Sequence, residues 1–361
     1  MKFALLGIDD ELLTLARELT ARGEHTIVAL YELGEHADAA RQLAPDADHK
    51  QQWESLLLED VVEGVLVGRG GSSGDARADQ LKKLVQAKVP LVVVHPACEY
   101  IDGYEIEMIR RDVGGIIIPY YPGISDPALD VLLAKANSTV EQIAFERRQA
   151  NRTRSAVLVQ LARDAEIARR LLGSVSKVGA FGTLHTDSPS ALTVQMTNDK
   201  GRSVRWSIEP ESDAPRGVLR FAREQDQVVL ALPDPAASLP GFCEQLPSLL
   251  RGEAMPAVTW IDCCRAQEVA DTVPRCLARG RSIDLYNEEH TEEGAFKGVM
   301  AVGGCLLLML GLLGVVFVAV VEGLQLPLYR FALWSNWPLY LCAVFFFFLL
   351  LQLLKLVARR S

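Results

Sequence analysis

The chain has 361 residues, a formal net charge of −9 and a pI near 5.3. This length is enough for two domains or more, and the acidic balance argues against a nucleic-acid-binding role. The 7 cysteines are an odd number and form no C-x-x-C motif, which predicts reduced, mostly buried thiols and no metal site. No basic segment followed by an apolar core opens the sequence, so we expect no cleavable signal peptide.

The first thirty-two residues predict the opening unit of a doubly wound α/β sheet. Lys2–Leu6 is an apolar run of strand type, and Gly7 breaks it. Glu11–Arg22 then has apolar residues at helical spacing, and His25–Tyr31 reads as a second strand. Ligands of such folds bind at the carboxyl ends of the strands, so the Gly7 turn and the following Glu32 would face a nucleotide.

The turn departs from the dinucleotide fingerprint G-x-G-x-x-G, whose second glycine lets the backbone approach the pyrophosphate. The six positions read Gly7, Ile8, Asp9, Asp10, Glu11 and Leu12. Three carboxylates therefore stand where phosphates would lie, and like charges about 4 Å apart repel by about 4 kcal/mol at an effective dielectric near 20. The alternative is that Asp9 or Asp10 is simply the N-cap of the helix. Glu32 is placed to bind a ribose hydroxyl, although acids also commonly end strands.

Apolar strands and helices alternate through residue 118, which predicts a parallel sheet covered on both faces and a first domain over 1–118. The expected strands are 64–68, 91–94 and 115–118, and the expected helices are 35–43, 79–87 and 105–111. The pattern changes at Pro119. Strand candidates then crowd the range 140–232, around a helix at about 158–172, and helices at 242–250 and 263–278 close the domain. We expect an antiparallel α+β domain over 119–289.

Two polar features of this body have alternative interpretations. Successive amides of Gly68, Arg69, Gly70 and the residues up to Asp75 can form an anion-binding nest, or the segment is a plain surface turn. The second domain also gathers many arginines, which indicate either a solvated face with ion pairs or a site for an anionic ligand. They are Arg147, Arg148, Arg152, Arg154, Arg163, Arg169 and Arg170.

The span Met1–Leu285 resembles the Gfo/Idh/MocA oxidoreductase family. The matching pieces are KFALLG, LLLEDVVEGVLVG, VPLVVVHP, LLGSVSKVGAF and RCLARGRSIDL, in the same order and spacing. The resemblance implies a Rossmann domain followed by an open-sheet domain, and NAD(P) as the cofactor. By this resemblance the residues that would border the cofactor are Gly7, Ile8, Asp9, Glu32, Gly68, Arg69 and Gly70.

The catalytic residues that the resemblance implies are replaced in this chain. The family carries Glu-Lys-Pro where this sequence reads Val94-His95-Pro96, and it carries Asp-x-x-x-His at the positions of Val159 and Arg163. Valine cannot transfer a proton, and arginine stays charged. His95 and Glu166 are the candidates for a remodelled proton relay. The alternative for His95 is a strand-end histidine with a satisfied hydrogen bond.

The last seventy residues predict a transmembrane hairpin over 296–357. Gly298–Val321 has 24 residues without a charge, and Pro338–Leu354 is also free of charge. Lys355, Arg359 and Arg360 follow the second segment, so the positive-inside rule places the body and both termini on the cytoplasmic side of the inner membrane.

Three functions stay open from the sequence. The first is a membrane-anchored, catalytically degenerate protein that binds a ligand or a partner. The second is an active NAD(P)-dependent dehydrogenase of sugar-type substrates with a remodelled site. The third is a structural membrane scaffold. We expect weak or no NAD(P) binding, contact with the lipid bilayer through 298–321 and 338–354, and a homo-oligomer formed through the antiparallel sheet domain.

Overall fold

The computed structural model describes residues 1–58, 62–124, 126–136, 142–222, 227–285, 308–321, 323–324, 342–343 and 346. Their contacts divide the chain into two units, Met1–Asn287 and Glu288–Ser361. The first unit holds both sheets and every residue expected at the cofactor site or in the proton relay.

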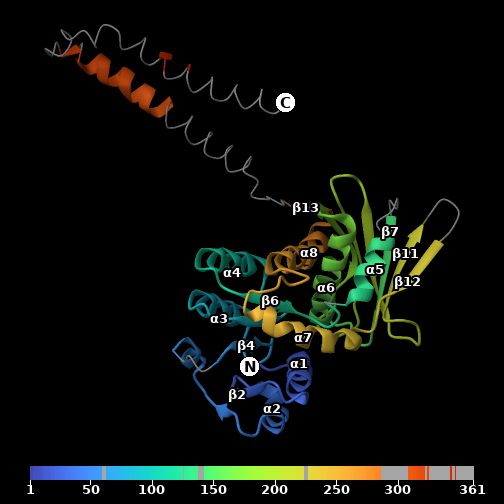
Figure 1. The fold of residues 1–361 in the computed structure, drawn as a ribbon. Coiled ribbons are helices and arrows are strands. Elements are labelled where there is room, and N and C mark those ends of the chain that lie inside the picture. The colour runs from blue at the N-terminus through green and yellow to red at the C-terminus, as the bar shows by residue number, and fades with distance from the viewer. Residues whose placement is uncertain are drawn as a thin grey trace. The chain divides into compact units, whose positions relative to one another are not determined.

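The first sheet has six parallel strands in the order β3-β2-β1-β4-β5-β6 (Figure 1). Strand order reverses between β1 and β4, as in a Rossmann fold, so the expected parallel sheet is confirmed. Its strands are β1 Lys2–Leu6, β2 Thr26–Tyr31, β3 Asp48–His49, β4 Gly64–Val67, β5 Leu91–Val94 and β6 Ile117–Tyr120.

Helices cover both faces of this sheet because its central strands are apolar on both sides. On one face, residues of α1 and α2 share a buried cluster with α7. On the other face, residues of α3 and α4 share a second cluster with the start of α8. These helices are α1 Asp10–Ala21, α2 Ala37–Leu43, α3 Gly74–Gln86, α4 Tyr100–Val113, α7 Leu239–Leu250 and α8 Trp260–Arg279, and the short helices η1 Gly34–His36 and η2 Trp53–Leu57 lie in connections.

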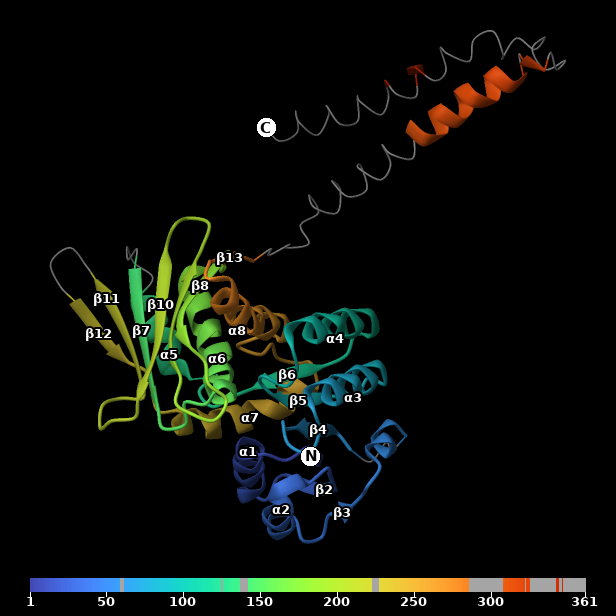
Figure 2. The same ribbon diagram turned by 180° about the vertical axis from the view of Figure 1, so that it is seen from behind.

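The second sheet has seven strands in the order β12-β11-β7-β10-β9-β8-β13 (Figure 2). The expectation of an antiparallel sheet was wrong at one pairing, since β10 runs parallel to β7 with Trp206 opposite Phe145. The chain passes through α6, β8 and β9 between these two strands, which gives β10 the direction of β7. The strands are β7 Gln142–Gln149, β8 Lys177–Thr183, β9 Ala191–Thr197, β10 Ser203–Pro210, β11 Gly217–Ala222, β12 Gln227–Ala231 and β13 Ile283–Asp284.

One face of the second sheet packs on α5 (Pro127–Ala136), α6 (Arg154–Leu172) and α8. Trp206 is fully buried there and donates from Nε1 to Asp164 of α6 at 2.8 Å. The helices α7 and α8 were expected to close the second domain, but they also pack on the first sheet through Phe242 and Trp260. The connection before α7 contains η3 Pro235–Ser238.

Several helices extend beyond the ranges that apolar spacing indicated. α3 starts at Gly74, where the Ser73 hydroxyl accepts from the amide of Ala76, and α4 starts at Tyr100. α8 begins with a capping box formed by Thr259 and Asp262. Apolar spacing alone therefore placed these three helix starts three to five residues too late.

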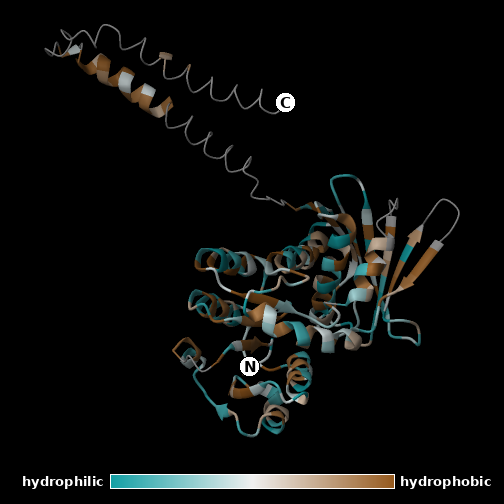
Figure 3. Ribbon diagram, in the orientation of Figure 1, coloured by the Kyte–Doolittle hydropathy of each residue, from teal (hydrophilic) through white to brown (hydrophobic). Residues whose placement is uncertain are grey.

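The second unit contributes a helix over 308–321 to the described residues, and Figure 3 shows it largely in the colours of apolar side chains. Leu308, Leu312 and Phe317 on it are each more than half exposed. Within the described residues, none of the helices combines the length and the apolar character that a bilayer crossing needs. Residues 298–307 and most of 338–354 lie outside the described residues, so the hairpin stays a prediction.

Candidate functional site

The turn after β1 begins with a glycine in the left-handed region and leads into an N-cap that the turn itself supplies. Gly7 has φ +68°, and its amide donates to the carbonyl of Tyr31 at 3.1 Å. Asp9 is the N-cap of α1, accepting from the amide of Leu12 at 2.8 Å, so the N-cap interpretation is confirmed. Burial acts to raise the pKa of Asp9, but hydrogen bonds from Leu12 and Arg69 and the charge of Arg69 bring it below the usual value.

The glycine-rich loop after β4 lies directly on this turn. A Cβ added to Gly70 would meet the carbonyl carbon of Ile8 at 2.8 Å, and one added to Gly7 would meet the Gly70 oxygen at 2.5 Å. A Cβ added to Gly71 would meet the Glu32 oxygen at 2.7 Å. Only glycines allow this backbone-to-backbone approach. The loop therefore lies against the Gly7 turn, which is where dinucleotide-binding folds hold the pyrophosphate.

One amide of the loop in which a nest was expected binds a carboxylate of the same chain. The Arg69 amide donates to Asp9 Oδ2 at 2.9 Å, and Arg69 Nε reaches the same oxygen at 3.1 Å. Arg69 Nη2 also lies 3.2 Å from Glu11. Two of the three acids that would repel a phosphate are thus paired with the loop.

Glu32 is held by three side chains that sequence analysis missed, here called the Glu32 cluster. Ser72 Oγ donates to Glu32 Oε2 at 2.7 Å, Arg77 Nη2 donates to Oε2 at 3.0 Å, and Gln80 Nε2 donates to Oε1 at 2.5 Å. Arg77 is 1% exposed, and it also donates to the Gly70 carbonyl at 2.6 Å. An arginine and a glutamine three residues apart on the inner face of α3 were the available signal.

His95 is buried at the end of β5. Its amide donates to Tyr120, and its peptide bond to Pro96 is cis. Burial, with the nearby charges of Arg163 and Arg69, lowers the pKa of His95 to about 3. Its Nε2 atom has no partner among the described residues, so the alternative of a side chain with a satisfied hydrogen bond does not hold for that atom.

Arg163, at the position of the family's histidine, joins the two sheet domains. It donates to Glu11 at 2.8 Å and to the carbonyl of His95 at 3.0 Å and 2.9 Å. Only 8% of Arg163 is exposed, so it does not belong to a solvated arginine face. This guanidinium lies where the resemblance implies a proton-transferring group.

Glu166 is also buried, but it faces a different partner. It accepts from Arg169 at 2.7 Å and lies 3.5 Å from Arg170. Burial raises the pKa of Glu166 to about 7, against the attraction of these arginines. No hydrogen bond joins Glu166 to His95 in the described part of the chain, so the two candidate relay residues do not form a pair.

The structure thus brings together seven residues that the resemblance implied for the cofactor, at the carboxyl ends of β1, β2 and β4. They are Gly7, Ile8, Asp9, Glu32, Gly68, Arg69 and Gly70. The carboxylates of Asp9 and Glu32 are paired within the chain, and the glycine-rich loop lies against the backbone of the turn. Among the described residues, no cluster of His, Cys, Asp or Glu is suited to hold a metal ion.

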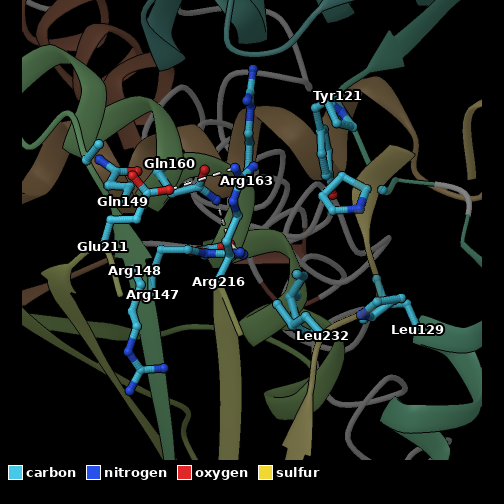
Figure 4. A pocket seen from close by; sticks show the side chains of 17 residues that line it. Tyr121, Leu129, Arg147, Arg148, Gln149, Gln160, Arg163, Glu211, Arg216 and Leu232 are labelled. Atoms are coloured by element: carbon cyan, nitrogen blue, oxygen red, sulfur yellow. Dashed lines mark hydrogen bonds and ion pairs between the residues drawn. The ribbon is translucent and has the colours of Figure 1, made fainter. Parts of the chain in front are cut away.

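A pocket of about 400 Å³ lies beside this edge, between β7 and α6 (Figure 4). Its lining includes Gln160 and Arg163 of α6, Arg147 of β7, Tyr121 and Arg216. Arg147 donates from Nε to the fully buried Asp164 at 2.8 Å. The pocket remains open while the turn after β1 is covered.

Comparison with known proteins shows which solved structures share this fold. No family model matches the sequence, and no curated protein matches it. Among solved structures, a myo-inositol dehydrogenase from Lactobacillus casei, in complex with NAD(H) and myo-inositol, has a TM-score of 0.66 at 13% identity, over 79% of this chain and 96% of that one.

Two further structures agree with it. A myo-inositol dehydrogenase from Corynebacterium glutamicum has a TM-score of 0.63 at 14% identity, over 79% of this chain and 98% of that one. An Agrobacterium radiobacter oxidoreductase, in complex with NAD⁺, L-tartaric acid and magnesium, has a TM-score of 0.63 at 11% identity, with the same coverage. At these identities the likeness establishes the two-domain fold, which confirms the resemblance at that level.

Proposed function

We propose that this chain, which has the two-domain fold of the Gfo/Idh/MocA-type oxidoreductases, binds its ligand without a dinucleotide. The observation that supports this most is the approach of the Gly68–Gly71 backbone to the Gly7 turn. A pyrophosphate needs the same backbone amides and the same space. The chain's own loop competes for that site as an intramolecular ligand, at an effective concentration that does not depend on how much protein is present.

The Glu32 cluster supports the same proposal. A ribose bound at Glu32 would have to displace hydrogen bonds from Ser72, Arg77 and Gln80. Hydrogen bonds to charged groups contribute about 1.5–3 kcal/mol each. Arg77 would then remain buried without its carboxylate partner, which adds to the free energy required.

The surroundings of the expected relay also favour a non-catalytic role. With a pKa of about 3, His95 is neutral near pH 7, so it cannot act as an acid and is only a weak base. Arg163 stays charged, and both of its contacts are structural. Glu166 is tied to Arg169.

Titration of the full-length protein with NADH, followed by nicotinamide fluorescence and by calorimetry, tests the proposal. We expect no saturation below about 1 mM, which corresponds to binding weaker than about −4 kcal/mol. A dissociation constant in the low micromolar range, about −8 kcal/mol, would contradict it. In that case Asp9→Gly should bind more tightly still, because it removes one carboxylate from the turn.

The second candidate is an NAD(P)-dependent dehydrogenase of sugar-type substrates, which the fold of the myo-inositol dehydrogenases favours. It requires the loop at Gly70 to leave the Gly7 turn, and it makes His95 the first residue to test. Assays with NAD⁺ or NADP⁺ and myo-inositol decide between the two. Turnover that disappears in His95→Ala would establish the second candidate, whereas turnover kept in that variant would eliminate His95 from it.

We also propose that 298–321 and 338–354 anchor the body to a membrane as a helical hairpin. The support is the absence of charge in both segments and the exposed apolar side chains of the helix over 308–321. The basic residues that flank the hairpin favour a cytoplasmic body. A single cysteine at Ser335 should react with a membrane-impermeant maleimide in intact cells, and one at Ser361 should not. The reverse labelling would place the body outside.

The homo-oligomer and the structural scaffold that the sequence suggested are proposals as well. A homo-oligomer through the second sheet is a proposal that sedimentation of the purified protein can test. A purely structural scaffold is the function left if neither a nucleotide nor any small ligand binds.

A further inference from the structure

The pocket between β7 and α6 contains an arginine that is fixed in place and still has donors to offer. Arg147 donates from Nε and Nη2 to Asp164, which leaves its Nη1 atom without a hydrogen bond among the described residues. The Nη1 atom is not among the buried unpaired atoms of the structure, so a ligand in the pocket can reach it. A guanidinium held on one edge and open on the other is pre-organised to receive a further acceptor.

The carboxylate of Asp164, which holds Arg147 in place, can accept no further hydrogen bond. Asp164 is 0% exposed and accepts from Arg147, from Trp206 at 2.8 Å and from Gln160 at 3.0 Å. A ligand in the pocket therefore meets the donor side of this ion pair and not its acceptor side. The charges of two other lining arginines are directed elsewhere, Arg148 to Glu146 and Arg163 to Glu11.

A second cation stands at the pocket with little to hold it. The Arg216 side chain is 76% exposed, and its ion pair with Glu211 is long, at 3.8 Å. Glu211 is half-exposed and also lines the pocket. An anion that enters would compete with Glu211 for Arg216, which gives the two residues opposite expected effects on binding.

Apolar side chains line the pocket next to these arginines. Leu129, Ile167 and Leu232 line it together with Tyr121 and several prolines, and Gln149 and Gln160 add two neutral polar side chains (Figure 4). Leu232 lies close to Arg147, since both would contact a Cβ added to Gly217. A volume of about 400 Å³ is within the usual range for small-molecule sites. The site therefore places guanidinium donors beside an apolar wall.

We propose that this pocket binds a small organic carboxylate, with the carboxylate on Arg147 and Arg216 and the apolar body against Leu129 and Leu232. The inference rests on the proposed function, because that function gives the chain a ligand whose chemistry is left open. It goes further in naming the chemistry of that ligand. Charge-assisted hydrogen bonds to guanidinium groups supply the selectivity for a carboxylate over a neutral amide of the same shape.

The test compares cyclohexanecarboxylate with its neutral isostere cyclohexanecarboxamide, each titrated into the full-length protein by calorimetry and ligand-observed NMR. We expect the acid to bind about tenfold more tightly than the amide, because hydrogen bonds to a charged acceptor are stronger than those to a neutral one. Added salt should weaken the acid and leave the amide unchanged. Equal binding of the two compounds overturns the inference.

Variants locate the site. Arg216→Gln should weaken the acid about threefold to tenfold, whereas Glu211→Gln should tighten it. Arg205→Gln is the matched control, because Arg205 is exposed on β10 and does not line the pocket. Arg147→Lys keeps a charge beside Asp164 but removes the open Nη1 donor, so it should also weaken the acid, with circular dichroism to check folding. An equal effect of Arg216→Gln and Arg205→Gln overturns the inference.

A titration repeated with 1 mM NADH separates this inference from the proposed function. Carboxylate binding that needs NADH would contradict cofactor independence and leave the anion site standing. Carboxylate binding that NADH does not change supports both. Absence of carboxylate binding under either condition overturns the anion site, and the NADH titration by itself then decides the proposed function.

Discussion

Two neighbouring regions of this molecule use the same residue types in opposite ways. At the edge of the first sheet, Arg77 is 1% exposed and lies between Glu32 and the Gly70 carbonyl. In the pocket on the second sheet, Arg216 is 76% exposed and only loosely paired. In the first region the charged side chains bind one another and the loop backbone. In the second region guanidinium donors remain available to a ligand.

The comparison shows why a count of charged residues does not identify a binding site. Two acids of the turn after β1, Asp9 and Glu11, are paired within the fold, so they do not act as the free charges that the sequence alone indicated. The cost of burying a charge is offset only by close partners, and a ligand must replace those partners to bind. Availability of donors, and not their number, distinguishes the open pocket from the closed edge.

Breaking the Glu32 cluster should have the largest effect on stability. Arg77→Met leaves Glu32 without its buried cation, and we expect a loss of about 3–5 kcal/mol in the free energy of unfolding, measured by chemical denaturation. Glu32→Gln in the same chain should recover part of this loss, since it removes the uncompensated charge. Strict additivity of the two substitutions would contradict the pairing.

Adding a side chain to the loop where it meets the turn should have the next largest effect on stability. Gly70→Ala places a methyl group against the Ile8 backbone, and we expect about 2 kcal/mol of destabilisation from overpacking. Gly74→Ala is the matched control, because nothing lies within 4 Å of the added Cβ and alanine favours the helix by about 1 kcal/mol. Equal stability of the two variants would mean that the loop does not rest on the turn.

The buried Glu166 should make stability depend on pH. Its pKa is raised from 4.5 to about 7, so its contribution is fully present below about pH 4.5 and is lost as pH rises through about 7. Between pH 5 and 7 we expect the wild type to lose about 2 kcal/mol more than Glu166→Gln does. Denaturation of both proteins at the two pH values measures this difference, and parallel pH profiles would exclude Glu166 as its source.

The smallest effect should come from the charge on the cap of α1. Asp9→Asn keeps an oxygen for the Leu12 amide but weakens the pairing with Arg69, and we expect a loss of about 0.5–1 kcal/mol. Asp9→Ala removes the cap as well, so it should lose roughly 1 kcal/mol more. If the two variants unfold at the same denaturant concentration, Asp9 does not act as a cap.

Much of the fold could be predicted from the sequence because its signals are local. The strand and helix periods of the first domain placed the parallel sheet correctly, and Leu91–Val94 lies between two parallel neighbours as expected. The cap at Asp9 depends on an amide three residues away, so a short segment contains both partners. The uncharged segments after residue 297 predict a membrane hairpin on the same local basis, and only part of those segments lies within the described residues.

The tertiary structure alone decided what the candidate site became. Glu32 meets Ser72 across 40 residues and Gln80 across 48, while Glu11 meets Arg163 across 152 residues. The parallel pairing of β10 with β7 likewise depends on the path of the intervening chain. Hydrogen bonds and ion pairs of this kind form only where strand ends and helix faces from distant segments come within about 3 Å, which local periodicity does not encode. For that reason the sequence revealed the acids of the turn, and only the fold revealed that the chain supplies their partners itself.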